Sequence, residues 1–136
     1  MTLESLKSTT TLLLIGDNDL PEDEQMLINA LEMAYLEISN KVSALKLLSP
    51  IDASDIIRMG PGGSYVRMPR LPNQGIDELD IDNELCPAVA RIIASYVSRN
   101  KGSLHQQEAD KIMNQYESKV RRFLEDEDTP TVAVST

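Results

Sequence analysis

Two adjacent helical patterns near the C-terminus constrain the fold of this chain most. Apolar residues recur every three or four positions from about residue 84 to 100, and again from about 104 to 126, which is the spacing of amphipathic helices. Gly102 lies between the two patterns and is a natural left-handed end for the first helix. Ser103 and Gln106 follow with the spacing of a capping box for the second helix. A connection this short makes the two helices antiparallel neighbours.

The same periodicity predicts a helix earlier in the chain. It would run from about 21 to 40, with Asp19 or Leu20 as its cap and Pro21 in its first turn. Acidic residues favour this start because they face the positive end of the helix dipole. The three helices together predict a core that includes Leu31, Tyr35, Val89, Ile93, Ile112, Tyr116 and Phe123.

The two ends of the chain lack this periodicity. Residues 1–16 are rich in Ser and Thr, and their apolar burst from Leu12 to Ile15 could form a short strand or a tether onto the body. Residues 129–136 are typical of a tail that stays disordered unless a partner holds it. We therefore expect a single helical domain over residues 1–128 and a C-terminal tail over 129–136.

A segment without acidic residues separates the first predicted helix from the helical pair. No Asp or Glu occurs between Asp55 and Asp77, although the formal net charge of the chain is −9. Ile56 to Met59 and Tyr65 to Met68 predict two short strands. Gly60-Pro61-Gly62-Gly63 joins them, and its glycines permit the backbone angles of a tight connection.

Composition agrees with a helical body. The chain is 41% hydrophobic but has one Phe and no Trp, so its core must consist of Leu, Ile, Val, Met and Ala. The predicted fold class is mainly α: a small helical bundle with an antiparallel helix pair plus a short β-hairpin arm at about 56–70.

The arm contains residue types that suit contact with another protein. Arginine forms ion pairs, while methionine and tyrosine provide adaptable apolar contact. A solvated hairpin whose charges prevent aggregation is the alternative. A tail that orders on assembly would add its own residues to such a contact. The predicted partner-binding residues are Arg58, Met59, Tyr65, Arg67, Met68, Arg70, Thr131, Val132 and Val134.

The pattern of titratable residues does not indicate an active site. His105 has no Cys or acid at ligand spacing, so a solvated or capping role is expected. Cys86 is the single cysteine, which excludes an internal disulfide, and we expect it to be a buried small hydrophobe. The acidic run from Asp77 to Glu84 lacks the glycine and glutamate spacing of a calcium loop, and a solvated lead-in with a helix cap is expected there. The chain is therefore expected not to be an enzyme and to need no cofactor or metal.

The acidic residues are clustered, and this bears on the partners. Residues 17–24, 77–84 and 125–128 hold 14 of the 22 acids. Such a chain does not favour sequence-independent binding of nucleic acid, because phosphates repel it. The N-terminus lacks a signal-peptide pattern, and Leu12 to Ile15 is too short to span a membrane. We expect a soluble protein that is made in a cytoplasm and has no membrane partner.

Five short patterns, in order along the chain, carry a resemblance to a known family. They are Leu20-Pro21-Glu22-Asp23 with Ala30-Leu31, Ser49-Pro50-Ile51-Asp52 through to Met68-Pro69, Ile81-Asp82-Asn83-Glu84-Leu85, Ala88-Val89-Ala90 through to Ala94-Ser95-Tyr96, and Tyr116-Glu117-Ser118-Lys119-Val120-Arg121-Arg122-Phe123-Leu124. Over about residues 20–125 the chain resembles the head-to-tail adaptor, or connector, proteins of tailed bacteriophages.

The resemblance implies a structural virion protein of the phage neck. Members of that family form a homo-oligomeric ring, commonly of twelve copies, below the portal protein of the head. Expected partners are further copies of the chain, the portal, and tail or neck proteins, while DNA passes through the ring without specific binding. Many members have additional helices that a chain of this length would lack, and the family has no catalytic residues to transfer.

Two other classes are alternatives to the ring. One is a small acidic regulatory or DNA-mimic protein that binds a host protein, with its acids spread over one face. The other is a small enzyme, which would need a pocket with convergent polar groups. The separation of the single His from the single Cys argues against an enzyme.

Overall fold

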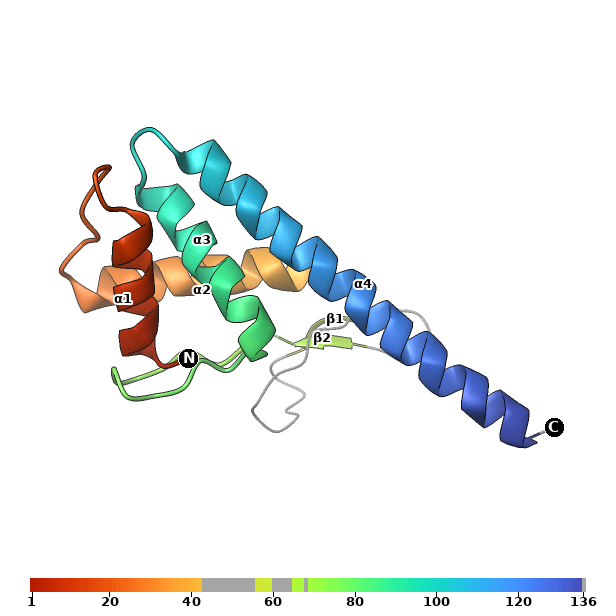
Figure 1. Ribbon diagram of the computed structural model, residues 1–136. Coiled ribbons are helices and arrows are strands. Elements are labelled where there is room, and N and C mark those ends of the chain that lie inside the picture. The colour runs from red at the N-terminus through yellow and green to blue at the C-terminus, as the bar shows by residue number, and fades with distance from the viewer. Residues whose placement is uncertain (43–55, 60–64, 68, 136) are drawn as a thin grey trace.

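Four α-helices make up most of the chain that is described: α1 (Leu3–Leu13), α2 (Glu24–Lys41), α3 (Cys86–Val97) and α4 (Gly102–Ser135). The computed structural model describes residues 1–42, 56–59, 65–67 and 69–135, with side chains for 1–42 and 69–119. Figure 1 shows α3 in the middle, with α1, α2 and α4 around it. The fold is mainly α, as the sequence predicts.

The central helix α3 is apolar on almost every side. Its buried residues include alanines that let neighbouring helices approach closely, and larger side chains such as Val89, Ile92 and Ile93 that fill the space between them. A short 3-10 turn, η3 (Asn83–Leu85), leads into α3, and the Asp82 side chain accepts a hydrogen bond from the backbone N–H of Glu84 at 3.1 Å. Pro87 lies in the first turn of α3, where a missing N–H costs no hydrogen bond. The predicted start near residue 84 is therefore confirmed to within two residues.

The helix α4 runs back along α3 as its antiparallel neighbour, which confirms the predicted pair (Figure 1). The predicted role of Gly102 is wrong, however, because α4 begins at Gly102 and this residue does not have a positive φ. A Cβ atom at Gly102 would lie 3.2 Å from the carbonyl oxygen of Ser95. A side chain at this position would crowd the Ser95 carbonyl, and glycine avoids that contact. The predicted capping box at Ser103 is also wrong, because α4 already begins at Gly102 and Ser103 lies inside the helix.

The N-terminal segment forms helix α1, so the expected short strand is wrong, whereas the alternative of a tether onto the body agrees with the burial of Leu14. The Thr2 side chain caps α1 by accepting from the Ser5 backbone N–H at 3.1 Å. Leu3 and Leu6 are buried, and the Thr10 hydroxyl donates to the Leu6 carbonyl at 2.7 Å, which satisfies a buried polar group. The Ser and Thr residues have low helix propensity, so packing of the leucines must supply the stability of α1.

Helix α2 begins later than its sequence predicts. Asp23, and not Asp19 or Leu20, is the cap, because its carboxylate accepts from the Gln25 backbone N–H at 2.9 Å. Pro21 therefore precedes the helix. The buried face follows the predicted spacing and consists of Leu27, Leu31, Ala34, Tyr35 and Ile38.

Two strands lie between α2 and the segment that leads to α3. Strands β1 (Ile56–Met59) and β2 (Tyr65–Arg67) pair antiparallel, with Arg58 opposite Val66. The connecting residues 60–64, Met68 and the strand side chains lie outside the described part of the chain. Whether this pair of strands acts as an arm remains a prediction.

Helix α4 continues through the region predicted as a tail and ends at Ser135. Pro130 and the β-branched Thr131 and Val132 are poor helix formers. Propagation of a helix that is already established gives this stretch local support. Residues 129–135 are therefore helical, and the expectation that a partner is needed to order this tail stays a prediction.

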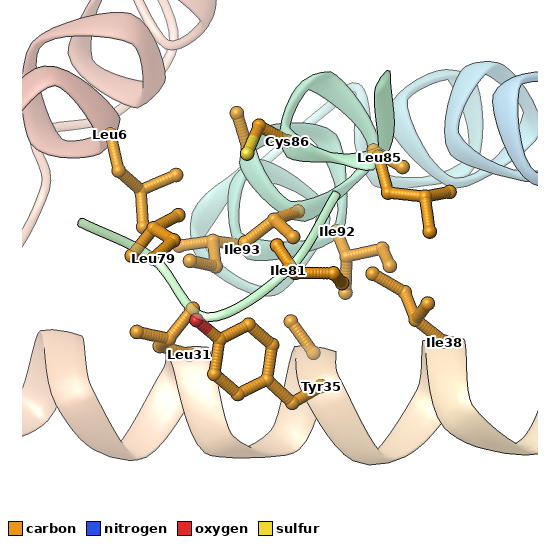
Figure 2. Packing of buried hydrophobic residues seen from close by; sticks show 14 of the residues in the cluster. Leu6, Leu31, Tyr35, Ile38, Leu79, Ile81, Leu85, Cys86, Ile92 and Ile93 are labelled. Atoms are coloured by element: carbon orange, nitrogen blue, oxygen red, sulfur yellow. The ribbon is translucent and has the colours of Figure 1, made fainter. Parts of the chain in front are cut away.

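The core lies where α3 meets α1, α2, α4 and residues 79–85. Figure 2 shows Leu31, Tyr35 and Ile38 of α2 facing Ile92 and Ile93 of α3. The sequence missed Leu79 and Ile81, which are buried although they lie in an acidic, non-helical segment. The predicted core residues Leu31, Tyr35, Val89, Ile93 and Tyr116 are confirmed, Ile112 is partly buried, and the Phe123 side chain lies outside the described part of the chain.

Replacing Ile93 with alanine should destabilise the fold by about 2–5 kcal/mol, because it removes a fully buried side chain and leaves a cavity. Urea unfolding followed by circular dichroism measures this change. The exposed Leu12 provides a matched control, and Leu12→Ala should change stability by less than about 0.5 kcal/mol. Equal effects of the two substitutions would contradict the assigned packing of α3.

Candidate interaction surface

An apolar hollow opens between α2, the C-terminal end of α3 and the loop that precedes α2. We call it the α2–α3 groove; its volume is about 580 Å³, and it is lined by α2 residues from Met26 to Met33, by Ile93, Tyr96 and Val97 of α3, and by residues 18–21. Met26 and Met33 remain 53% and 58% exposed, and Tyr96 remains 41% exposed. Methionine and tyrosine at this exposure are typical of protein-binding surfaces.

The exposed apolar residues of α2 follow one side of the helix. Met26, Met33 and Leu36 are separated by seven and three residues, which places them on a common stripe. The stripe lies beside the buried face that packs on α3. An outward helix face is normally polar, so α2 presents more apolar surface than a solvated helix requires.

The segment that includes the α2 side of the groove is acidic in sequence. Residues 17–40 contain seven acids and no Lys or Arg. Asp19 lines the groove and is exposed. Burial raises the pKa of the Tyr96 hydroxyl, and the nearby Glu37 carboxylate raises it further. The groove is thus an apolar surface with Asp19 in its lining and the Glu37 carboxylate near Tyr96.

Asp17 is the acid of this cluster that supports the fold. Its carboxylate accepts hydrogen bonds from the Ser98 hydroxyl and from the Arg99 backbone N–H, the latter at 2.9 Å. These donors, the Ser98 hydroxyl first, lower the pKa of Asp17. The contact ties the loop after α1 to the end of α3, which forms one wall of the groove.

Of the predicted partner-binding residues, only Arg70 has a described side chain, so their grouping into one site stays a prediction. Arg58, Met59, Tyr65 and Arg67 belong to the paired strands. Arg70 is exposed, and its backbone N–H donates to the Asp80 carboxylate at 2.7 Å, which fixes the backbone at residue 70 to the body. Met68 lies outside the described part of the chain. The remaining three residues, Thr131, Val132 and Val134, belong to the C-terminal end of α4.

Several acids of the run at 77–84 accept hydrogen bonds from the backbone and so support the fold, which the sequence does not indicate. Asp77 accepts from the backbone N–H groups of Asn73 and Gln74, both at 2.9 Å. Asp80 is buried, so a solvated role is wrong for it, while the expected cap is confirmed at Asp82. No group of three or more His, Cys, Asp or Glu residues suited to a metal ion occurs among the described residues.

His105 is buried, which contradicts its predicted solvated or capping role. Its side chain is 3% exposed, and its Nδ1 atom lies 3.1 Å from the Arg91 guanidinium. Arginine can only donate, so Nδ1 must accept and the ring must be neutral with its proton on Nε2. Burial lowers the pKa of His105, and the Arg91 charge lowers it further. Spacing along the chain does not reveal this contact, because Arg91 lies on the preceding helix.

Cys86 is buried at the start of α3, as expected for a small hydrophobe. Burial raises the pKa of its thiol, so the thiol resists forming the reactive thiolate. The described hydrogen bonds of Cys86 go to Asp82 and Asn83, whereas His105 contacts Arg91, so these hydrogen bonds do not pair the thiol with the imidazole.

Comparison with family models, with curated proteins and with solved structures finds no match to this chain. Across the described helices, none has the length and apolar content needed to cross a membrane.

The buried neutral His105 should make the fold sensitive to mild acid. Its folded pKa lies below the unfolded value of about 6.5, so the unfolded chain binds the proton more readily. Stability should therefore fall as the pH decreases below about 6.5 and continue to fall until the folded pKa is passed.

His105→Gln keeps an acceptor for Arg91 and cannot titrate, so it is the matched variant. Urea midpoints measured from pH 8 to pH 5 should show the wild type losing stability relative to this variant below pH 6.5. Parallel curves for the two proteins would show that His105 is not held neutral in the folded state.

Proposed function

We propose that this chain is a structural virion protein that assembles into a homo-oligomeric ring at the head-to-tail junction of a tailed bacteriophage. The ring would join the portal of the head to tail or neck proteins and provide a duct for DNA. The observation that carries the proposal is the length by which α4 extends past the body.

The first half of α4 packs on the body, and the backbone of the second half continues past it. The Tyr116 hydroxyl donates to Asp82 at 3.1 Å, and Lys119 forms an ion pair with Glu84. Residues 120–135 continue beyond these contacts and away from the other helices (Figure 1), over about 24 Å at 1.5 Å per residue. An isolated helix of this length is marginally stable in water, so a neighbouring chain is a natural support for it.

The sequence of this projecting half suits both a subunit contact and a channel. It contains the predicted partner-binding residues Thr131, Val132 and Val134 and the acidic cluster at 125–128. Asp77, Asp80 and Asp82 are engaged in hydrogen bonds within the body, so we assign the cluster at 125–128 to the duct. A negative wall repels DNA phosphates and keeps the duplex from adhering.

A regulatory or DNA-mimic protein is the alternative function. The acids of residues 17–40 favour this alternative in part, because they are clustered in α2 and in the loop that precedes it. Such a protein would be monomeric or dimeric. The oligomeric state therefore decides between the two functions.

Purified protein should form a discrete assembly whose mass is a multiple of 15.1 kDa and whose images show a ring. Native mass spectrometry and negative-stain microscopy measure these properties, and labelled protein should be found at the neck of virions that contain it. A species that stays monomeric or dimeric at every concentration would contradict the ring and support the regulatory class.

Neutralising the cluster at 125–128 with the corresponding amides should leave the ring intact and increase its affinity for duplex DNA, since repulsion is removed. Fluorescence anisotropy with a labelled duplex at physiological salt measures the affinity. Amide substitutions at Glu22 and Glu24 are the control and should have a smaller effect. Tight binding of DNA by the wild-type ring would contradict the assignment of a repulsive duct.

A further inference from the structure

The first two turns of α4 are attached to α3 through a titratable side chain. Over residues 102–111, the buried side chains of α4 are those of His105 and Ala109. Leu104 is the one large apolar residue of this stretch, and it is 49% exposed. Alanine offers little surface for packing, so the imidazole of His105 fills the place that a leucine or isoleucine normally holds in a helix pair.

The imidazole is only half satisfied in this contact. Its Nδ1 atom accepts from the Arg91 guanidinium at 3.1 Å, so its proton is on Nε2. The Nε2 atom is buried and has no hydrogen-bond partner among the described residues. A buried donor without an acceptor weakens the contact that contains it.

Two cations face the imidazole and oppose a second proton. Arg91 lies on α3, and Lys101 belongs to the link between α3 and α4. A protonated ring carries N–H donors on both nitrogens, so Nδ1 would meet an arginine that can only donate. A buried charge without a partner is costly in itself. Proton uptake therefore turns the attachment of α4 from attractive to repulsive.

The acids near this site are engaged by other donors. Asp17, in the loop after α1, favours a charged imidazole. Its carboxylate, however, accepts from the Ser98 hydroxyl and from the Arg99 backbone N–H. From α2, the Glu37 carboxylate accepts from the Gln106 side chain at 3.2 Å. These bonds hold both carboxylates in place, so neither one replaces the acceptor that the charged ring lacks.

The following turns of α4 are attached independently of His105. Met113 and Tyr116 are buried against the body, and the Tyr116 hydroxyl donates to Asp82 at 3.1 Å. These contacts begin about two turns beyond His105. Tyrosine and aspartate ordinarily titrate far from neutral pH, so mild acid leaves this part of the attachment unchanged.

We propose that the His105–Arg91 contact is an acid-operated latch: when the imidazole takes up a proton, the first two turns of α4 separate from α3 while the following turns stay bound. Separation returns both cations to water. Gln106 moves with these turns and releases Glu37, the acid near Tyr96 in the α2–α3 groove. The latch thereby couples mild acid to the candidate interaction surface, and it does not depend on the proposed ring.

The direction of the pH effect follows from proton binding. In the open form the imidazole is in water and its pKa is about 6.5, whereas burial and Arg91 lower the pKa in the closed form. The open form binds the proton better, so opening increases as the pH falls below about 6.5. At pH 5.5 one proton can raise the opening equilibrium by at most about tenfold. His105 is the single histidine of the chain, and histidine is the side chain that ordinarily titrates in this range.

Hydrogen exchange of single backbone amides, measured by NMR on the full chain without a histidine tag, tests the latch. Rates are compared as protection factors, which remove the direct effect of pH on the exchange chemistry. At pH 5.5 and low urea, residues 106–109 should be less protected than residues 113–116. Their exchange should also be nearly independent of urea, because a local opening exposes little surface. From pH 5.5 to pH 7.5, protection at 106–109 should rise several-fold, up to about tenfold.

Three variants assign the effect to the latch. His105→Gln keeps an acceptor for Arg91 and cannot titrate, so protection at 106–109 should be the same at both pH values. Arg91→Gln keeps a donor for Nδ1 but removes the cation, so the pH effect should shrink. Arg99→Gln, on an exposed position of the link, is the matched control and should keep the full effect. A pH effect that persists in His105→Gln would overturn the latch, as would equal protection and equal urea dependence of 106–109 and 113–116 at pH 5.5.

The imidazole of the unaltered chain provides a second measurement if His105→Gln does not fold. At pH 7.5 its ¹⁵N NMR signals should show a proton on Nε2 and none on Nδ1. On acidification, uptake of the second proton should accompany the loss of protection at 106–109. A ring with its proton on Nδ1 at pH 7.5, or proton uptake without loss of protection at 106–109, would overturn the latch.

Discussion

The packing of α3 on all its sides is the constraint on which the rest of the structure depends. Its alanines and branched aliphatic residues meet α1, α2, α4 and the segment before η3, so no other helix can be removed without exposing it. A helix that is apolar all round must be surrounded. In a chain with one Phe and no Trp, this arrangement replaces the large aromatic anchors that small domains commonly use.

The surroundings of α3 also account for the position of the polar contacts. Asp17 binds the end of α3, Asp82 begins the turn that leads into it, and Lys41 of α2 reaches Asp110 of α4 at 2.9 Å. Exposed ion pairs such as Lys41–Asp110 contribute little to stability on their own. Their use here is to set how the outer helices lie around a core that is chemically uniform and would otherwise allow several arrangements.

Sequence reasoning recovered the parts of the fold that follow from periodicity. The pair α3 and α4, the buried face of α2 and the core residues Leu31, Val89 and Ile93 all repeat at helical spacing. It failed where tertiary contact overrides local preference. Helix α1 consists largely of Ser and Thr, and its leucines gain stability only against α3. Gly102 relieves a close approach to the Ser95 carbonyl, which no sequence pattern reveals.

The candidate surface was only partly predictable for the same reason. The charge contrast between residues 17–40 and the arm is visible in the sequence. The groove is not, because Tyr96 and Met33 come from different helices whose crossing brings them together. His105 likewise acquires its environment from Arg91 on the neighbouring helix.

The one-sided anchoring of α4 makes that helix a lever. Its described contacts with the body end near Lys119, and about 24 Å of helix follow. A tilt of about 10° at the anchored half would displace the free end by about 4 Å over this length. Small adjustments in the packing around Tyr116 are thereby magnified at Ser135, while the core of the body stays as it is.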